Sequence, residues 1–340
     1  MTAAGSGPAV VGPAVIDTAV VDTAGTVAAE IRSVGPRIGV RPPFALLRSG
    51  TERLFDAARQ VRDLGFDHAV IGDHVSFRGG YGSDGLIQAT ALLMAAPGVE
   101  VHTGVFLLPL RHPVPVARQV ATLAALAPGR FVFGVGIGGE DRAEIEACGV
   151  DPATRGRRMD EALVVLRALL AGEAVTVDGE HFRLRDVRVS PPPAVAVPIV
   201  IGGRSAAAVR RAGRHGDGWL GVWVSPDRYA AVTAEIDGVA VSAGRTGMAW
   251  RHALLVWCGF GRSVEDAGCS VSRAMESFYG VPFDRFSKYV PRGTPQDVAE
   301  ALVPYLEAGC CDVHLLPVAG DEDEAMESAA QVRRLLVRRG

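Results

Sequence analysis

The chain has 340 residues, of which 48% are hydrophobic and 21% charged, and its formal net charge is −3 at pH 7. This balance is typical of a globular protein and gives no reason to expect nucleic acid or membrane lipid as a partner, and no apolar run reaches the roughly 18 residues of a membrane span. The five cysteines are scattered and odd in number, so we expect reduced thiols and a cytoplasmic protein.

The N-terminal segment differs from the rest of the chain. Its residues repeat Ala, Val, Gly and Thr, with no helical or strand period that survives the interruptions. A segment that cannot bury enough apolar surface to offset the entropy of ordering stays disordered. We therefore expect a disordered tail over residues 1–36 and one folded domain over residues 37–340.

From Arg37 onward, short apolar runs alternate with amphipathic segments. Thr51 is a predicted N-cap, and Gly65 is a predicted left-handed cap at the end of the same helix. A glycine-rich loop is predicted over 78–85 and a small hairpin over 175–184. The predicted helices are 51–64, 86–96, 117–127, 157–171, 205–214, 226–243 and 294–308. The predicted strands are 38–40, 66–71, 99–108, 131–133, 199–201, 219–223, 252–258 and 312–316.

This alternation predicts the fold class. Nearly continuous apolar strands separated by helices indicate a parallel sheet that is covered on both faces. Eight such units close most readily into a barrel, so we predict an α/β fold of the (β/α)8 TIM-barrel type, with an insertion before the last strand.

A glycine run after the fourth strand invites a different interpretation. Gly134, Gly136 and Gly139 fit the G-x-G-x-x-G pattern of dinucleotide-binding folds. However, Glu140 and Asp141 stand where the pyrophosphate would need a helix N-terminus free of negative charge. The pattern also lies outside the first strand–helix unit, where this fingerprint normally occurs. We therefore reject a nicotinamide-binding fold.

Three segments resemble the luciferase-like monooxygenase family, and within it the branch that uses the deazaflavin coenzyme F420. They are ARQVATLAALAPGRFVFGVGIGGE (117–140), IGGRSAAAVRRAGRHGDGWL (201–220) and RGTPQDVAEALVPYLEAGCCDV (292–313). The resemblance extends over residues 37–317. It implies a TIM barrel with its cofactor at the C-terminal mouth, usually in a homodimer, that catalyses hydride transfer or flavin-dependent oxygenation.

Barrel geometry places the active site where the strands end, which brings 105–108, 137–140 and 202–205 to one mouth together with Asp73 and His74. The resemblance implies that Asp73 meets the cofactor's ring system and that His74 lies beside the reacting carbon. Histidine suits this role because it titrates near neutrality and can take a hydroxyl proton. The alternative is that Asp73 caps a turn and His74 packs or faces solvent.

Glu140 is the candidate acid. A carboxyl group at the end of the fourth strand could protonate a product or hold a substrate hydroxyl. In the deazaflavin sugar-phosphate dehydrogenases of the family a glutamate follows G-x-G directly, whereas here Gly139 intervenes. The alternative is a solvated acid favoured by the dipole of the following helix.

The remaining candidate residues are cofactor contacts. Backbone N–H groups at Gly202 and Gly203, the Arg204 charge and the Ser205 hydroxyl precede a helix and could cradle a phosphate; the alternative is a plain turn with Ser205 as N-cap. The resemblance implies a non-prolyl cis bond near Val105 and Phe106, against the cofactor ring. Further cofactor contacts are predicted at Ile137 and Gly138.

Aromatic residues provide candidate pocket walls. Trp219 and Trp223 alternate along the sixth predicted strand, and a second group precedes the last predicted helix. Either group could wall a pocket for an apolar or ring-shaped substrate, and the alternative is core and dimer packing. The eight histidines do not recur at a spacing such as H-x-x-x-H, so we expect no metal site. The second aromatic group is Phe278, Tyr279, Phe283, Phe286 and Tyr289.

Three functions follow as hypotheses. The first is an F420-dependent oxidoreductase that transfers a hydride between the deazaflavin and a small organic substrate. The second is a monooxygenase that uses O₂ and reduced FMN supplied by a partner reductase. The third is a barrel that carries a cofactor or ligand without turnover.

Overall fold

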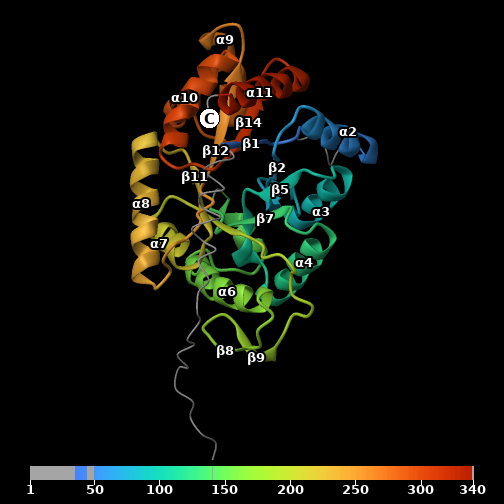
Figure 1. The fold of residues 1–340 in the computed structure, drawn as a ribbon, viewed down its shortest axis with the longest axis vertical. Coiled ribbons are helices and arrows are strands. Elements are labelled where there is room, and N and C mark those ends of the chain that lie inside the picture. The colour runs from blue at the N-terminus through green and yellow to red at the C-terminus, as the bar shows by residue number, and fades with distance from the viewer. Residues whose placement is uncertain (1–34, 44–49, 140, 339–340) are drawn as a thin grey trace, which may run out of the picture.

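The structure, a computed structural model, describes residues 35–43, 50–139 and 141–338 (Figure 1). The predicted tail over 1–36 therefore lies almost entirely outside the described residues, as does Glu140. None of the helices in the described ranges combines the length and apolar character needed to cross a bilayer.

Parallel strands form a closed barrel, as predicted. Within the described residues, eight strands follow the order β10–β11–β12–β14–β1–β2–β5–β7, and pairing of β7 with β10 closes the ring. Their burial is nearly complete, which explains their continuous apolar runs. The strands are β1 (Arg37–Val40), β2 (His68–Ile71), β5 (Glu100–Thr103), β7 (Phe131–Gly136), β10 (Ile199–Gly202), β11 (Gly218–Val222), β12 (Ala253–Phe260) and β14 (Asp312–Val318).

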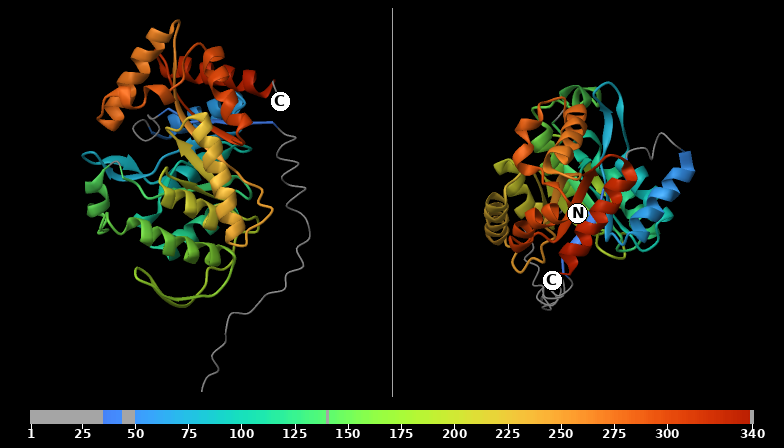
Figure 2. Two further views of the ribbon diagram at one scale, coloured as in Figure 1. Left: turned by 90° about the vertical axis from the view of Figure 1, so that its left-hand side faces the viewer. Right: turned by 90° about the horizontal axis from the view of Figure 1, so that it is seen from above.

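Helices surround the strands on the outside (Figures 1 and 2). They bury apolar faces against the barrel in the main hydrophobic core. The helices are α2 (Gly50–Asp63), α3 (Gly85–Ala95), α4 (Pro113–Leu126), α5 (Arg142–Ala147), α6 (Arg155–Leu170), α7 (Ala206–His215), α8 (Pro226–Ser242), α9 (Val264–Tyr279), α10 (Pro295–Glu307) and α11 (Glu322–Val337). Helix α9 and the hairpin of β8 (Val175–Asp178) and β9 (Arg183–Val187) lie at opposite ends of the molecule (Figure 1).

Several predicted boundaries were wrong. The third predicted strand, 99–108, is divided: β5 ends at Thr103, a cis peptide bond joins Gly104 to Val105, and β6 (Phe106–Leu107) then pairs with β7. The predicted loop over 78–85 contains β4 (Tyr81–Ser83), which pairs with β3 (His74–Phe77).

The helices also differ from the prediction. Helix α2 begins at Gly50, one residue before Thr51, the predicted N-cap. Helices α5, α9 and α11 were not predicted, although each carries a capping signal: the side chains of Asp141, Ser263 and Asp321 accept hydrogen bonds from backbone N–H groups two or three residues on.

The interior of the barrel has a polar half and an apolar half. Val132, Val200, Leu220 and Ala253, from β7, β10, β11 and the start of β12, form an apolar cluster. The other strands place charged groups inside at their N-terminal ends. Asp312 accepts hydrogen bonds from Arg37 Nε (3.1 Å) and Arg251 Nε (3.1 Å), and both arginines also pair with Glu100.

These ion pairs lie at the N-terminal end of the barrel. Burial raises the pKa of Asp312, but the charge of Arg251 and the other positive groups around it outweigh this effect and hold the pKa well below its usual value. Asp312 is therefore ionised in the core, where its charge holds Arg37 and Arg251 in place.

Candidate active site

A cavity of about 240 Å³ opens at the C-terminal mouth of the barrel. Residues on or directly after all eight barrel strands line it, together with Phe278 and Tyr279 from α9. The structure thus brings most of the predicted site residues together around one space. The predicted site residues that line it are Asp73, His74, Val105, Ile137, Gly138, Gly202, Gly203 and Arg204.

Phe106 and Ser205 do not line this cavity. Phe106 is buried and packs against Phe133 at a centroid distance of 5.3 Å, so it belongs to the core. The Ser205 hydroxyl accepts a hydrogen bond from the Ala208 N–H at 3.2 Å and caps α7. The geometry of Ser205 is therefore that of the N-cap we weighed as the alternative.

His74 is held by a buried carboxylate. Its Nδ1 lies 3.1 Å from Oε2 of Glu144, on the short helix α5. The other oxygen, Oε1, accepts hydrogen bonds from the N–H groups of Val75 (2.6 Å) and Ser76 (3.2 Å). The Glu144 side chain is 4% exposed and that of His74 is 20% exposed, so the imidazole is the member of the pair that reaches the cavity.

The charge on Glu144 determines which nitrogen of His74 carries the proton. Burial raises the pKa of Glu144, but the hydrogen bonds from His74, Val75 and Ser76 outweigh it and leave the pKa below its usual value. An ionised Glu144 accepts the proton of Nδ1, and Nε2 of a neutral His74 then carries the lone pair. His74 is thus arranged as a base toward the cavity.

Sequence reasoning did not find Glu144. The predicted acid was Glu140, four residues earlier, because dehydrogenases of the family carry a glutamate close to this position. Glu144 lies on α5, a helix that was not predicted, and 70 residues separate it from His74. Glu140 itself lies outside the described residues, so its role stays a prediction.

Asp73 lies two residues after β2, and its carboxylate is engaged within the protein. Oδ2 accepts hydrogen bonds from Arg111 Nη1 (2.5 Å) and the Leu107 N–H (2.9 Å), and Oδ1 accepts from Arg111 Nη2 (2.8 Å) and the Gly85 N–H (2.9 Å). The guanidinium carbon of Arg111 lies 4.4 Å from the ring centroid of Phe106. Asp73 therefore ties β2 to the segment after β5 and to the start of α3.

Glycines make room for Val105 at the centre of the mouth. A Cβ atom on Gly136 would lie 2.4 Å from Val105 Cγ2, and one on Gly202 would lie 2.7 Å from Val105 Cγ1. Real Cβ atoms do not approach so closely, so only glycine at both positions admits the valine side chain. The result is an apolar platform between β7 and β10, bordered by Ile137 and by Gly138, whose φ is +68°.

Arg204 lies at the edge of this platform, two residues before α7. Its guanidinium carbon is 5.2 Å from the ring centroid of Trp223, which also lines the cavity. Trp219 has a different role, because it is buried and donates a hydrogen bond to the Gly203 carbonyl at 2.7 Å. Of the two tryptophans, Trp223 therefore walls the site and Trp219 belongs to the core.

Aromatic side chains cover His74 on the opposite side. Its ring stacks on Phe77 at a centroid distance of 4.3 Å, and Phe278 lies 6.3 Å away. Phe77 and Phe278, with Trp257 and Met326, also line a neighbouring cavity of about 590 Å³. Phe77 and Phe278 therefore form an apolar boundary between His74 and this neighbouring cavity, whereas Arg41 lines both the mouth cavity and the space on the β3–β4 side of His74. From the second predicted aromatic group, Phe278 and Tyr279 line the cavity at the mouth, whereas Phe286 packs behind Trp223 at 4.6 Å.

Comparison with known proteins agrees with this architecture. The luciferase-like monooxygenase family matches residues 40–293, and the chain belongs to this family. An F420-dependent glucose-6-phosphate dehydrogenase of Beutenbergia cavernae is 37% identical over 165 residues, which cover 47% of this chain and 49% of the relative. A protein of the same name from Microbacterium testaceum is 33% identical over 207 residues, covering 58% and 61%. The matches thus extend over about half the length of these relatives.

Solved structures share the fold. An F420-dependent secondary alcohol dehydrogenase in complex with an F420–acetone adduct superposes with a TM-score of 0.74 at 22% identity, covering 88% of this chain and 98% of that one. The oxygenating constituent of 3,6-diketocamphane monooxygenase from Pseudomonas putida, in complex with FMN, has a TM-score of 0.68 at 16% identity, with coverage of 89% and 98%. At these identities the likeness shows a common fold.

Proposed function

We propose that the protein is an F420-dependent oxidoreductase that transfers a hydride between the deazaflavin and a small organic substrate. The observation that carries the proposal is His74, oriented by Glu144 and directed at the mouth of the barrel. It is supported by the relatives named for F420, which match the chain at 33–37% identity. The proposal extends to a cytoplasmic homodimer, on the resemblance to the family.

The residues present fit such a cofactor. The platform of Val105, made possible by Gly136 and Gly202, offers an apolar surface for a flat ring system. Arg204 and the N–H groups at the start of α7 offer a cation and backbone donors to a phosphate. The Asp73 carboxylate, already satisfied by Arg111, would position the platform through Leu107.

The chain's own chemistry is proton transfer at His74. When bound, the deazaflavin would supply a carbon that accepts or donates a hydride. In alcohol oxidation, Nε2 of His74 takes the hydroxyl proton, and Glu144 stabilises the imidazolium that forms. In the opposite direction the same imidazolium returns the proton. Phe77 and Phe278 cover one side of the base.

A second candidate is an FMN-dependent monooxygenase that uses O₂ and a partner reductase. The specific observation in its favour is the common fold with the FMN-bound oxygenase from Pseudomonas putida. The same platform and the same phosphate contacts would serve FMN. The two proposals therefore differ in cofactor choice.

A binding titration separates the two candidates. Purified full-length protein is titrated with F420 and with FMN, and fluorescence is followed. We expect saturable, selective binding of F420 in the micromolar range or tighter. Arg204→Met should weaken F420 binding about tenfold to a hundredfold, because hydrogen bonds to charged groups contribute about 1.5–3 kcal/mol. Arg228→Met, at an exposed position on α8, is the matched control and should bind as wild type does.

Each result has a clear meaning. Preference for FMN, with O₂ consumption that depends on reduced FMN, would replace the first proposal by the second. Tight F420 binding without redox change on a panel of alcohols, aldehydes, enones and imines would instead indicate a carrier of the cofactor.

A further inference from the structure

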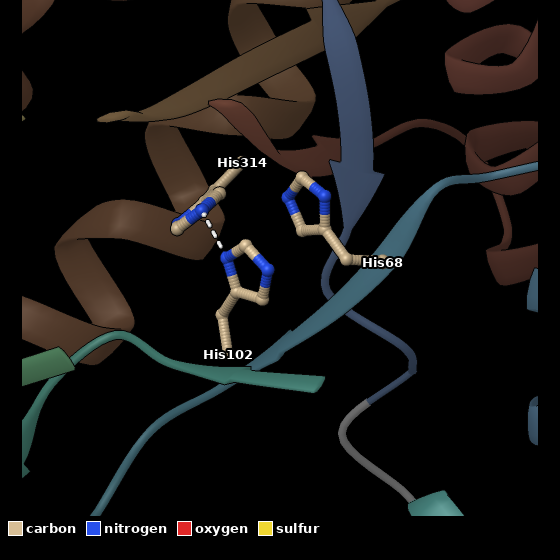
Figure 3. A group of neighbouring side chains, drawn as sticks. All are labelled: His68, His102 and His314. Carbon is tan, nitrogen blue, oxygen red and sulfur yellow. Dashed lines mark hydrogen bonds between the residues drawn. The ribbon is translucent and has the colours of Figure 1, made fainter. Parts of the chain in front are cut away.

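Three histidines meet inside the barrel, on its polar half (Figure 3). His68 comes from β2, His102 from β5 and His314 from β14. His102 Nδ1 lies 3.2 Å from His314 Nε2, and the rings of His68 and His102 are parallel, with centroids 4.0 Å apart. One nitrogen from each ring can be chosen so that all three lie within 4.8 Å of one another.

The surroundings leave these rings neutral and short of partners. All three side chains are at most 2% exposed. Burial lowers the pKa of His68 and of His102 well below the usual value, and it lowers the pKa of His314 to about 4. Neither nitrogen of His68 has a hydrogen-bond partner, and Nδ1 of His314 has none either. A buried polar atom without a partner is unfavourable, and a ligand bound here would supply the missing interactions.

We propose that His68, His102 and His314 bind one divalent transition-metal ion, of the class of Zn²⁺, in the core of the barrel. Three neutral imidazoles are typical ligands of such ions. Two nitrogens bound to a tetrahedral zinc at ~2.0–2.1 Å are roughly 3.3 Å apart, and the 3.2 Å between His102 Nδ1 and His314 Nε2 matches this spacing. Binding then needs a closer approach of His68 and a His314 tautomer with its proton on Nδ1, so that Nε2 presents its lone pair to the ion.

Carboxylates lie near the outer nitrogens of two of the three histidines, an arrangement that is common in metal sites. Glu100 Oε2 accepts a hydrogen bond from His102 Nε2 at 3.0 Å, which leaves Nδ1 as the lone-pair nitrogen that faces His314. Asp312 Oδ1 lies 3.8 Å from His68 Nδ1, so the remaining nitrogen of His68, Nε2, is the one available to the ion. Both carboxylates are themselves held by Arg37 and Arg251.

The absence of a side chain at Gly39 leaves room for the His68 ring. Gly39 lies opposite His314 in the register of β1 and β14, and a Cβ atom on Gly39 would lie 2.0 Å from the His68 ring. Any other residue at 39 would therefore displace the ring. The site is separated from the proposed redox chemistry, because the histidines lie within the barrel whereas His74 and its cavity lie at the mouth. The ion would stabilise the fold by joining three strands.

This proposal departs from the expectation of no metal site. That expectation relied on spacing along the chain, and the three histidines come from three different strands. A second group, Glu161, Glu180 and His181, also has metal-compatible spacing, but it is not buried. Carboxylates of that kind are common without an ion, and the exposed group serves as an internal comparison.

The test is the metal content of the full chain, purified with a histidine-free tag from medium supplemented with zinc and then dialysed against EDTA. We expect roughly one zinc per chain by mass spectrometry. Protein from cobalt-supplemented medium should show the visible absorption of tetrahedral Co²⁺. Metal at background level, with no such spectrum, would overturn the proposal.

The metal content of histidine variants tests where the ion binds. His102→Gln and His314→Gln should each lose most of the bound metal, whereas His181→Gln should retain it. Should a core variant fail to fold, refolding of the wild-type chain decides instead: we expect a higher denaturation midpoint with zinc than with EDTA. Equal midpoints, or metal that survives both core substitutions, would contradict the assignment.

Discussion

Arg111 forms a bidentate ion pair with the buried carboxylate of Asp73, with Nη1 and Nη2 donating at 2.5 and 2.8 Å. The side chain of Asp73 is fully buried and that of Arg111 is 20% exposed. Asp73 directly precedes His74, the proposed base, and Arg111 follows the segment that carries Val105. The ion pair therefore joins these two parts of the chain. The pair therefore couples the position of His74 to the apolar platform.

Replacing Arg111 should destabilise the protein strongly. In Arg111→Met the Asp73 carboxylate stays buried without its cation, and removing one partner of a buried pair costs about 3–5 kcal/mol. Equilibrium denaturation in guanidinium chloride measures the change. Arg142→Met is the control, because Arg142 and Glu146 form an exposed pair on α5. Equal effects of the two substitutions would contradict the importance of burial here.

His74→Ala should abolish most turnover and leave the cofactor bound. The imidazole supplies the proton transfer, which contributes roughly 10²–10⁴-fold to rate. Its removal takes away no part of the Val105 platform or of the Arg204 contact. Steady-state kinetics and the F420 titration are measured on the same preparation. Unchanged turnover would remove His74 from the mechanism, and lost binding would assign it to the cofactor site.

Glu144→Gln should reduce turnover less than His74→Ala, by on the order of 10²-fold. A neutral amide stabilises the imidazolium less than a carboxylate does, so proton transfer at His74 should be slower. F420 binding should stay unchanged, because Glu144 does not line the cavity at the mouth. Glu146→Gln on the same helix is the matched control, since Glu146 pairs with the exposed Arg142. The role of Glu144 would be refuted by equal turnover of the two variants.

Stability should fall as the pH is lowered from 6.5 toward 4. Burial lowers the pKa of His252 from 6.5 to about 4, although the charge of Asp237 opposes this effect. Between these values the unfolded chain binds the proton and the folded protein does not, so acid favours unfolding, by up to about 3 kcal/mol for this group.

The contribution of His252 can be isolated. In the native protein the backbone N–H of Trp219 donates a hydrogen bond to His252 Nδ1 at 3.2 Å. His252→Asn keeps an acceptor for this N–H and does not titrate in this range. Denaturation midpoints of wild type and variant are compared at pH 7 and pH 4.5. The variant should lose less stability over the interval, and parallel losses would show that other groups account for the pH dependence.

Local patterns were sufficient for the architecture and for part of the site. The alternation of apolar runs and amphipathic segments predicted the closed barrel, because each strand and helix is recognised from its own residues. Barrel geometry then placed Asp73, His74 and the glycines of β7 and β10 at one mouth, since parallel strands all end at the same side. Capping residues predicted the start of α10, where Thr294 and Asp297 form a capping box.

Only the tertiary structure decided which side chains from distant parts of the chain contact one another. Glu144 reaches His74 over 70 residues of chain, and Arg111 reaches Asp73 over 38. The histidine cluster joins β2, β5 and β14, whose separation along the chain hides any ligand spacing. These contacts depend on the register and inward alternation of neighbouring strands and on the path of loops between them. The sequence by itself determined which residues stand at strand ends, and closure of the barrel determined which of them meet.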